Sequence, residues 1–287
     1  MMAPLTVGHR GVADADIRSR TTFTSTVIDT WVITRRNLLR NVRLPQVLLF
    51  STVQPIMFLL LFTFVFGGAI TGTLPEVAGG EYINWLIPGL LVQVSVFGAG
   101  QTAIGLTDDL KKGVIDRFRS LPMARSAVLA GRTFADLGRN AAVVTLMILV
   151  GFAIGFRYQT SFPRFVAGVL LALAFAYALS WVMAVIGLYV KEPEATQSAV
   201  FLPVFPLVFA SSVFLPTETM PDWLRVFADH QPITTVTNAL RALMLGEGAL
   251  LEGQVLATQL LLSAVWIVGI TLVFSLWAIR AYRRAVS

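Results

Sequence analysis

Six long apolar runs constrain this sequence more than any other feature. They cover residues 46–70, 85–106, 140–156, 165–190, 196–215 and 255–279, and none of them contains Asp, Glu, Lys, Arg or His. Crossing about 30 Å of hydrocarbon takes roughly 20 apolar residues in a helix, and a backbone in lipid must satisfy its own hydrogen bonds. We therefore expect an all-α, polytopic membrane protein with six transmembrane helices.

The composition excludes several classes of function. Only 13% of the residues are charged, whereas charged residues approach about 25% in soluble domains. The absence of cysteine excludes disulfides and thiol catalysis, and the two distant histidines, His9 and His230, offer no metal site. None of the lysines follows a glycine, as a phosphate-binding loop requires. We expect no catalytic site, no metal and no cofactor bound by this chain.

The basic residues predict the orientation in the membrane. With the N-terminus in the cytoplasm, 18 of the 22 Lys and Arg residues lie on the cytoplasmic side and 4 on the outer side. Positive charge accumulates on cytoplasmic loops. We therefore expect a multi-pass protein of the plasma membrane with both termini in the cytoplasm.

A segment before the first run has the pattern of a helix lying in the membrane interface. After a cytoplasmic tail, residues 1–23, the segment 24–45 places apolar side chains on one side of a helix and polar ones, Asn37 among them, on the other. The residues expected to mark this interfacial helix are Trp31, Arg35, Arg36 and Arg40.

The charged loop 107–133, between the second and third runs, contains a short amphipathic segment. Between Gly113 and Pro122, the side chains of Ile115, Phe118 and Leu121 share one helical face. This apolar face suits either a protein partner or the lipid surface, and the pattern alone does not choose between them. The preceding carboxylates, Asp108 and Asp109, have the helical spacing to pair with Lys111 and Lys112; the less favoured interpretation is a membrane-bound hydrolase.

Two motifs carry a resemblance to a known family. The loop contains Gly113 followed by Arg119-Ser-Leu-Pro-Met123, and the segment 216–254 contains Met220-Pro-Asp-Trp-Leu224, Gln231-Pro232 and Ala239-Leu-Arg-Ala-Leu243. Together with six runs and an interfacial helix, this order resembles the type-2 permeases of ATP-binding-cassette (ABC) exporters, in particular the daunorubicin-resistance (DrrB-like) permeases. The resemblance covers a permease domain at residues 46–280, followed by a cytoplasmic tail at 281–287.

The resemblance implies partners and site residues. A separate nucleotide-binding subunit, which binds ATP and Mg, would receive the loop as a coupling helix, and a second permease copy would complete a homodimer or a heterodimer. Within the outer segment 216–254, residues Pro221 to Gly246 would form paired short helices that cap the pathway before the last span. The implied coupling residues are Gly113, Val114, Ile115, Phe118, Arg119, Leu121, Pro122 and Met123, and the implied outer-segment residues are Pro221, Trp223, Gln231, Pro232 and Arg241.

These features favour an exporter subunit that moves an amphiphilic or lipid-like substrate, such as a drug, a glycolipid or a polyketide lipid. A hydrophilic polymer such as a polysaccharide is the alternative cargo within the family. An ion-coupled secondary transporter is the alternative mechanism, although the uncharged runs disfavour it. No substrate-binding residue is predicted, because amphiphile sites built from Leu, Phe and Met look like ordinary packed or lipid-facing surface.

Overall fold

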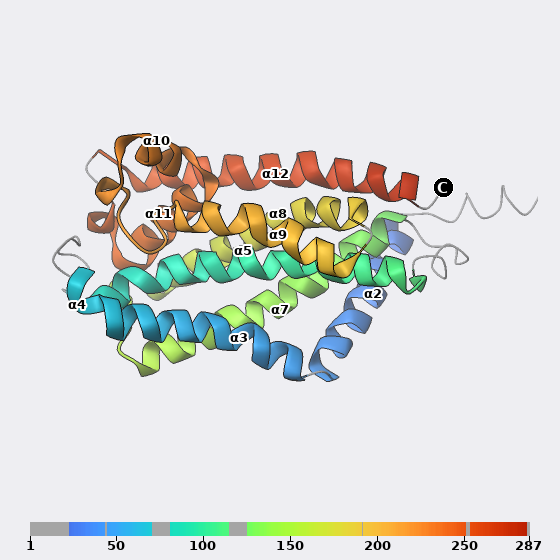
Figure 1. The fold of residues 1–287 in the computed structure, drawn as a ribbon, viewed down its shortest axis with the longest axis horizontal. Helices are drawn as coiled ribbons and strands as arrows, with labels where there is room; N and C mark the ends of the chain where they lie inside the picture. Colours follow the sequence, from blue (N-terminus) through green and yellow to red (C-terminus); the bar gives the residue numbers. More distant parts are fainter. Residues whose placement is uncertain are drawn as a thin grey trace, which may run out of the picture.

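The structure is a computed structural model that describes residues 23–43, 45–70, 81–114, 125–190, 192–250 and 253–285. All regular secondary structure in this part of the chain is helical, which confirms the all-α prediction. The helices lie side by side in an elongated bundle (Figure 1). In chain order they are α2 (Phe23–Arg43), α3 (Pro45–Leu60), η1 (Leu61–Phe66), α4 (Gly67–Ile70), α5 (Tyr82–Lys111), α7 (Arg125–Ala153), α8 (Phe162–Tyr189), α9 (Pro193–Phe209), η4 (Thr217–Thr219), α10 (Asp222–His230), α11 (Pro232–Leu245), η5 (Glu247–Ala249) and α12 (Leu256–Ala285).

The prediction of six spans is confirmed in part. Among the described residues, four helical stretches are long and apolar enough to cross a membrane, namely Tyr82–Lys111, Ala127–Ala153, Phe162–Tyr189 and Leu256–Tyr282. The first apolar run folds as α3, the π-helical turn η1 and α4, with Pro55 inside α3. The fifth run forms α9, which has 17 residues. Each of the six runs therefore lies mainly on helices, although residues 210–215 of the fifth run follow the end of α9, and four of the runs lie on helices with the length and composition of a full span.

Helix α5 forms the centre of the bundle. Of the 18 consecutive residues of α5 that are most apolar, 89% are buried inside the protein, whereas the corresponding share for α12 is 6%. Helices α7, α8 and α9 all pack against α5, whereas α12 packs mainly on α8 and α11. The outward side of α12 is apolar, as expected of a surface that faces lipid, and its most exposed large side chains are Leu261, Val265, Val268, Leu272, Val273 and Leu276.

The two ends of the bundle differ in what they carry. We call the end where α5 and α7 adjoin residues 115–124 the loop end, and α2 and the C-terminus lie there too (Figure 1). We call the opposite end, formed by α10 and α11, the hairpin end. These two names make no statement about the sides of the membrane.

Helix α2 packs along α7 at the loop end. The side chains of Trp31, Arg35 and Arg36 are exposed, as the interfacial pattern predicted, whereas Arg40 lies outside the residues whose side chains the structure describes. The prediction for Asn37 is wrong, because this side chain is buried and not on the polar outer face. Helix α2 therefore uses a polar side chain in its packing interface.

Candidate functional site

The predicted coupling segment begins where α5 ends. Gly113 has a φ of +64°, in the left-handed region that favours glycine, and its N–H donates to the carbonyl of Leu110 at 3.1 Å. Gly113 and Val114 are the only predicted coupling residues within the described part of the chain. The others, Ile115, Phe118, Arg119, Leu121, Pro122 and Met123, lie outside it.

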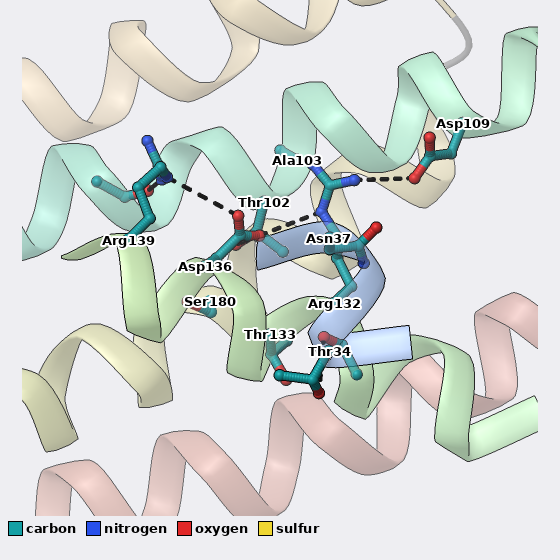
Figure 2. A network of polar contacts seen from close by, with 12 residues as sticks. Thr34, Asn37, Thr102, Ala103, Asp109, Arg132, Thr133, Asp136, Arg139 and Ser180 are labelled. Atoms are coloured by element: carbon teal, nitrogen blue, oxygen red, sulfur yellow. Dashed lines mark hydrogen bonds and ion pairs between the residues drawn. The ribbon is translucent and has the colours of Figure 1, made fainter. Parts of the chain in front are cut away.

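A buried ionic network ties together the two helices that flank this segment. Arg132 of α7 donates from Nη1 to Oδ2 of Asp109 on α5 at 2.8 Å, and its Nε lies 3.3 Å from Oδ2 of Asp136. The Thr102 hydroxyl donates to the same Asp136 oxygen at 2.8 Å. Arg139 lies 3.9 Å from the other Asp136 oxygen. Figure 2 shows the guanidinium of Arg132 between the two carboxylates, pointing from α7 toward α5.

The spacing along each helix explains why these side chains meet. Arg132, Asp136 and Arg139 are four and three residues apart, so they share one face of α7. Thr102 and Asp109 are seven residues apart on α5 and face them. The two positive charges of the guanidiniums equal the two negative charges of the carboxylates, and buried charges require such a counter-charge. The network therefore joins α5 and α7 near the start of the predicted coupling segment.

Two glycines of α5 make this close packing possible. A Cβ built on Gly105 would lie 1.5 Å from Nη2 of Arg132, and one built on Gly98 would lie 1.8 Å from Oδ1 of Asn140. The carbonyl of Gly98 also accepts a hydrogen bond from Nη2 of Arg139 at 2.8 Å. Any larger residue at these two positions would displace the polar side chains of α7.

Helix α2 contacts α7 beside the network. Ile33 lies over Gly131, where an added Cβ would be 2.7 Å from the Ile33 Cβ. The Thr34 hydroxyl donates to the Thr30 carbonyl at 2.7 Å and approaches the Gly131 carbonyl at 3.3 Å. Figure 2 draws Thr34 and Asn37 of α2 in the same group of polar side chains as Arg132. A movement of α7 at the loop end would therefore also displace α2, the predicted interfacial helix.

The sequence identified only part of this arrangement. The predicted pairing of Asp108 with Lys112 is confirmed at 2.8 Å. Lys111 instead reaches Glu192 at 2.5 Å, and Asp109 reaches Arg132, two partners that the local spacing did not predict. The signal that was available is the shared face of Arg132, Asp136 and Arg139, which a helical projection of residues 125–140 displays.

At the hairpin end, the motif residues of the segment 216–254 organise two short helices. Pro221 precedes α10, Pro232 is the first residue of α11, and Gly246 ends α11 with a φ of +102°. Gln231 separates the two helices, and its Nε2 donates to the Ala210 carbonyl. Trp223 is 75% exposed on α10. The segment thus returns toward the bundle as a helical hairpin between α9 and α12.

Arg241 of α11 is fully buried at this end, with a relative exposure of 0%. Its guanidinium carbon lies 3.7 Å from the ring centroid of Trp85. Its Nε donates to the Trp85 carbonyl at 3.2 Å, and its Nη2 donates to the Val213 carbonyl at 2.9 Å. Burial lowers the pKa of Arg241 to about 9, so the side chain is still protonated at neutral pH. Arg241 therefore joins α11, α5 and the turn after α9.

Comparison with known proteins assigns the chain to a family. The sequence pattern of the family described as ABC-2 type transporter matches residues 28–245, which is most of the chain. The chain belongs to the ABC-2 type transporter family. It is accordingly a multi-pass membrane permease, the non-catalytic transmembrane subunit of an ABC transporter. The described residues contain no cluster of His, Asp and Glu that could hold a metal ion.

Several curated proteins are similar to this permease over most of its length. The daunorubicin resistance ABC transporter permease protein DrrB1 of Streptomyces coeruleorubidus is 32% identical over 83% of this chain and 80% of its own. The doxorubicin resistance ABC transporter permease protein DrrB of Mycobacterium tuberculosis (strain ATCC 25618 / H37Rv) is 29% identical over 74% of each chain. A putative transport permease, ycf38 of Cyanophora paradoxa, is 22% identical over 74% of this chain and 73% of its own.

Proposed function

We propose that this permease is the six-span membrane subunit of an exporter for amphiphilic or lipid-like substrates, driven by ATP that a separate subunit hydrolyses. The four full-length spans are joined by two more, the continuous helical run α3, η1 and α4, and α9. At 1.5 Å per residue, the 17 residues of α9 extend about 25 Å, close to the thickness of the hydrocarbon core. In this arrangement both termini and the loop end lie in the cytoplasm.

The observation that carries the proposal is the ionic network beside the predicted coupling segment. Residues Gly113 to Met123 dock in a groove of the ATPase, and Phe118 supplies an apolar anchor. Since α5 and α7 flank this segment and are joined through Arg132, force applied there reaches both helices together. A coupling element needs a mechanical connection of this kind to the spans.

The buried carboxylates do not favour the ion-coupled alternative. Asp109 and Asp136 are both engaged by Arg132, and Asp136 also accepts from Thr102. An ion-coupled carrier needs groups that are open to the coupling ion, whereas these two carboxylates are already engaged by side chains of the protein. The network is better suited to transmitting movement than to carrying a proton.

The proposed cargo is supported by the names of two relatives. Two of the similar permeases are named for resistance to daunorubicin or doxorubicin, which are aromatic amphiphiles. An aromatic amphiphilic drug is therefore the first cargo to test. A second permease copy would provide the other half of the pathway.

Co-purification of the ATPase tests the coupling site. The tagged permease is expressed with the neighbouring genes, extracted in mild detergent and examined for a stoichiometric ATP-binding subunit. Phe118→Asp should lower the recovered ATPase by about tenfold or more, because a packed apolar anchor becomes an unpaired charge. Phe227→Asp is the matched control, because Phe227 is a half-exposed residue of α10 at the hairpin end.

Transport assays test the energy source and the cargo. In inverted membrane vesicles, daunorubicin uptake should require ATP and should persist when ionophores collapse the ion gradients. Full ATPase recovery and ATP-driven uptake in Phe118→Asp would refute the placement of the coupling helix. Uptake that collapses with the ion gradient while ATP is held constant would refute the exporter mechanism itself.

A further inference from the structure

A cleft opens between α3, α5, α7 and α9 on the side of α5 that also carries Gly98. It has about 80 Å³ of volume accessible to a water-sized group, several times the roughly 10–15 Å³ that one water needs. Its lining includes Phe58, Gln93, Phe97, Arg139, Asn140 and Phe201. This volume admits a polar group with part of a ring, although not a whole drug molecule.

Two buried amides in this cleft have polar atoms without a protein partner. Gln93 of α5 and Asn140 of α7 are 3% and 1% exposed. Within the part of the chain that the structure describes, Oε1 of Gln93 and Nδ2 of Asn140 accept or donate no hydrogen bond. An unsatisfied buried polar atom costs about 1–3 kcal/mol. Both atoms lie in the wall of the cleft with almost no accessible surface, so a ligand that turns the two amides toward the cleft would relieve this cost.

The charges around the cleft indicate that this ligand group is neutral. Arg139 is the charged residue in the lining, and its guanidinium is engaged by the Gly98 carbonyl and lies near Asp136. Asp136 and Asp109 balance Arg139 and Arg132, so the network has no net charge. An ionised ligand group would enter this low-dielectric site without a counter-charge, which is unfavourable.

Aromatic side chains define the apolar part of the ligand. Phe97 and Phe201 lie with their ring centroids 5.5 Å apart, and Phe58 borders the cleft from α3. Aromatic rings pack against one another in offset or tilted arrangements. A flat ring carried by the ligand would extend these contacts next to the two amides.

We propose that this cleft binds aromatic amphiphiles through a neutral group that contains both a hydrogen-bond donor and an acceptor, such as a carboxamide. Gln93 accepts from the ligand, Asn140 donates to it, and the ring lies against Phe97 and Phe201. This assignment rests on the proposed function in one respect, because it makes the cleft a site for the exported substrate within one permease chain.

The position of the cleft also connects the ligand to the coupling segment. Asn140 follows Arg139 directly, and Arg139 lies beside Asp136 in the network that continues through Arg132 to Asp109 (Figure 2). A ligand that reorients Asn140 therefore acts on the residue next to the network. Binding in the cleft would therefore change the positions of α5 and α7 where they adjoin the coupling segment.

Photo-cross-linking tests the site without requiring transport. The full-length permease in lipid nanodiscs is irradiated with 4-benzoylbenzamide, a neutral aryl ketone with one carboxamide, and the labelled peptides are mapped. Labels are expected on α3, α5, α7 or α9 around the cleft. Gln93→Leu and Asn140→Leu should each raise the half-saturating probe concentration about tenfold, since each removes one hydrogen bond to the ligand.

The controls separate binding from structure. Gln259→Leu removes a buried amide from α12, outside the cleft, and should leave labelling unchanged. Gln93→Leu and Asn140→Leu should not lower the unfolding temperature, because each removes an unsatisfied polar atom. Unchanged half-saturation in both cleft variants, labels mapped elsewhere, or an equal loss in Gln259→Leu would overturn the proposal. Any of these results combined with intact ATP-driven uptake would leave the exporter function standing.

Discussion

The two ends of the bundle hold buried guanidiniums in different ways. At the loop end, Arg132 and Arg139 lie among two carboxylates, Asp109 and Asp136, across the interface between α5 and α7. At the hairpin end, Arg241 meets the face of Trp85 and two backbone carbonyls, and it makes no ion pair with a carboxylate in the described residues. One end balances charge with charge, and the other solvates a single charge with backbone dipoles.

This difference suggests different mechanical roles. A guanidinium between two carboxylates can exchange partners, so α5 and α7 can shift while every charge stays paired. Carbonyls and a ring surface are fixed to the backbone and to the core, so Arg241 loses its contacts if α11 moves away from α5. We therefore expect the loop end to allow small shifts of α5 against α7 while the two helices stay joined, and the hairpin end to hold three segments in place.

Removing Arg132 should have the largest effect. Arg132→Met leaves Asp109 and Asp136 without their shared partner, and breaking a buried ion pair costs about 3–5 kcal/mol. Unfolding of the purified permease in mixed micelles, followed by tryptophan fluorescence, measures this loss. The stimulation of the ATPase by the permease should fall as well, because α5 and α7 are no longer joined.

A rescue variant sharpens this test. Arg132→Met combined with Asp109→Asn leaves Asp136 beside Arg139 and no charge of the network without a counter-charge, so most of the lost stability should return. The ATPase stimulation should stay low, because the connection between α5 and α7 is still missing. Recovery of both quantities would mean that the network contributes stability alone and takes no part in coupling.

Removing Arg241 should have an intermediate effect. Arg241→Met loses two charge-assisted hydrogen bonds and the contact with Trp85, although it leaves no buried charge behind. We expect a loss of about 2 kcal/mol in the free energy of unfolding, smaller than that of Arg132→Met in the same micelles. A loss equal to or larger than that of Arg132→Met would contradict the distinction between the two ends.

The sequence predicted the fold better than the site. Runs of about 20 apolar residues require helices in lipid, and α5, α7, α8 and α12 follow from that rule alone. Gly113, which the sequence places at the start of the amphipathic loop segment, lies at the end of α5 with a positive φ that favours glycine. These are local properties, and a single chain displays them.

The ionic network and the cleft depend on contacts between helices, which the sequence does not display. The partners Asp109 and Arg132 are 23 residues apart, and their contact depends on the space that Gly105 leaves open. Asp109 therefore looked like a surface residue with a local lysine partner. Gln93 and Asn140 likewise look like ordinary polar positions until α5 and α7 bring them to one cleft.

The smallest expected effect compares two neighbouring carboxylates of α5. Asp108 pairs with Lys112 at the surface, whereas Asp109 pairs with Arg132 inside the bundle. Asp108→Asn should cost no more than about 0.5 kcal/mol, as exposed pairs four residues apart on a helix do. Asp109→Asn should cost several times more, because a buried guanidinium loses one of its two carboxylates. Adding salt should reduce the first effect and leave the second nearly unchanged, since dissolved ions screen the exposed pair much more than the buried one. Equal costs at both positions would show that the contact between Asp109 and Arg132 is open to solvent, and the loop end would then lack the buried connection on which coupling depends.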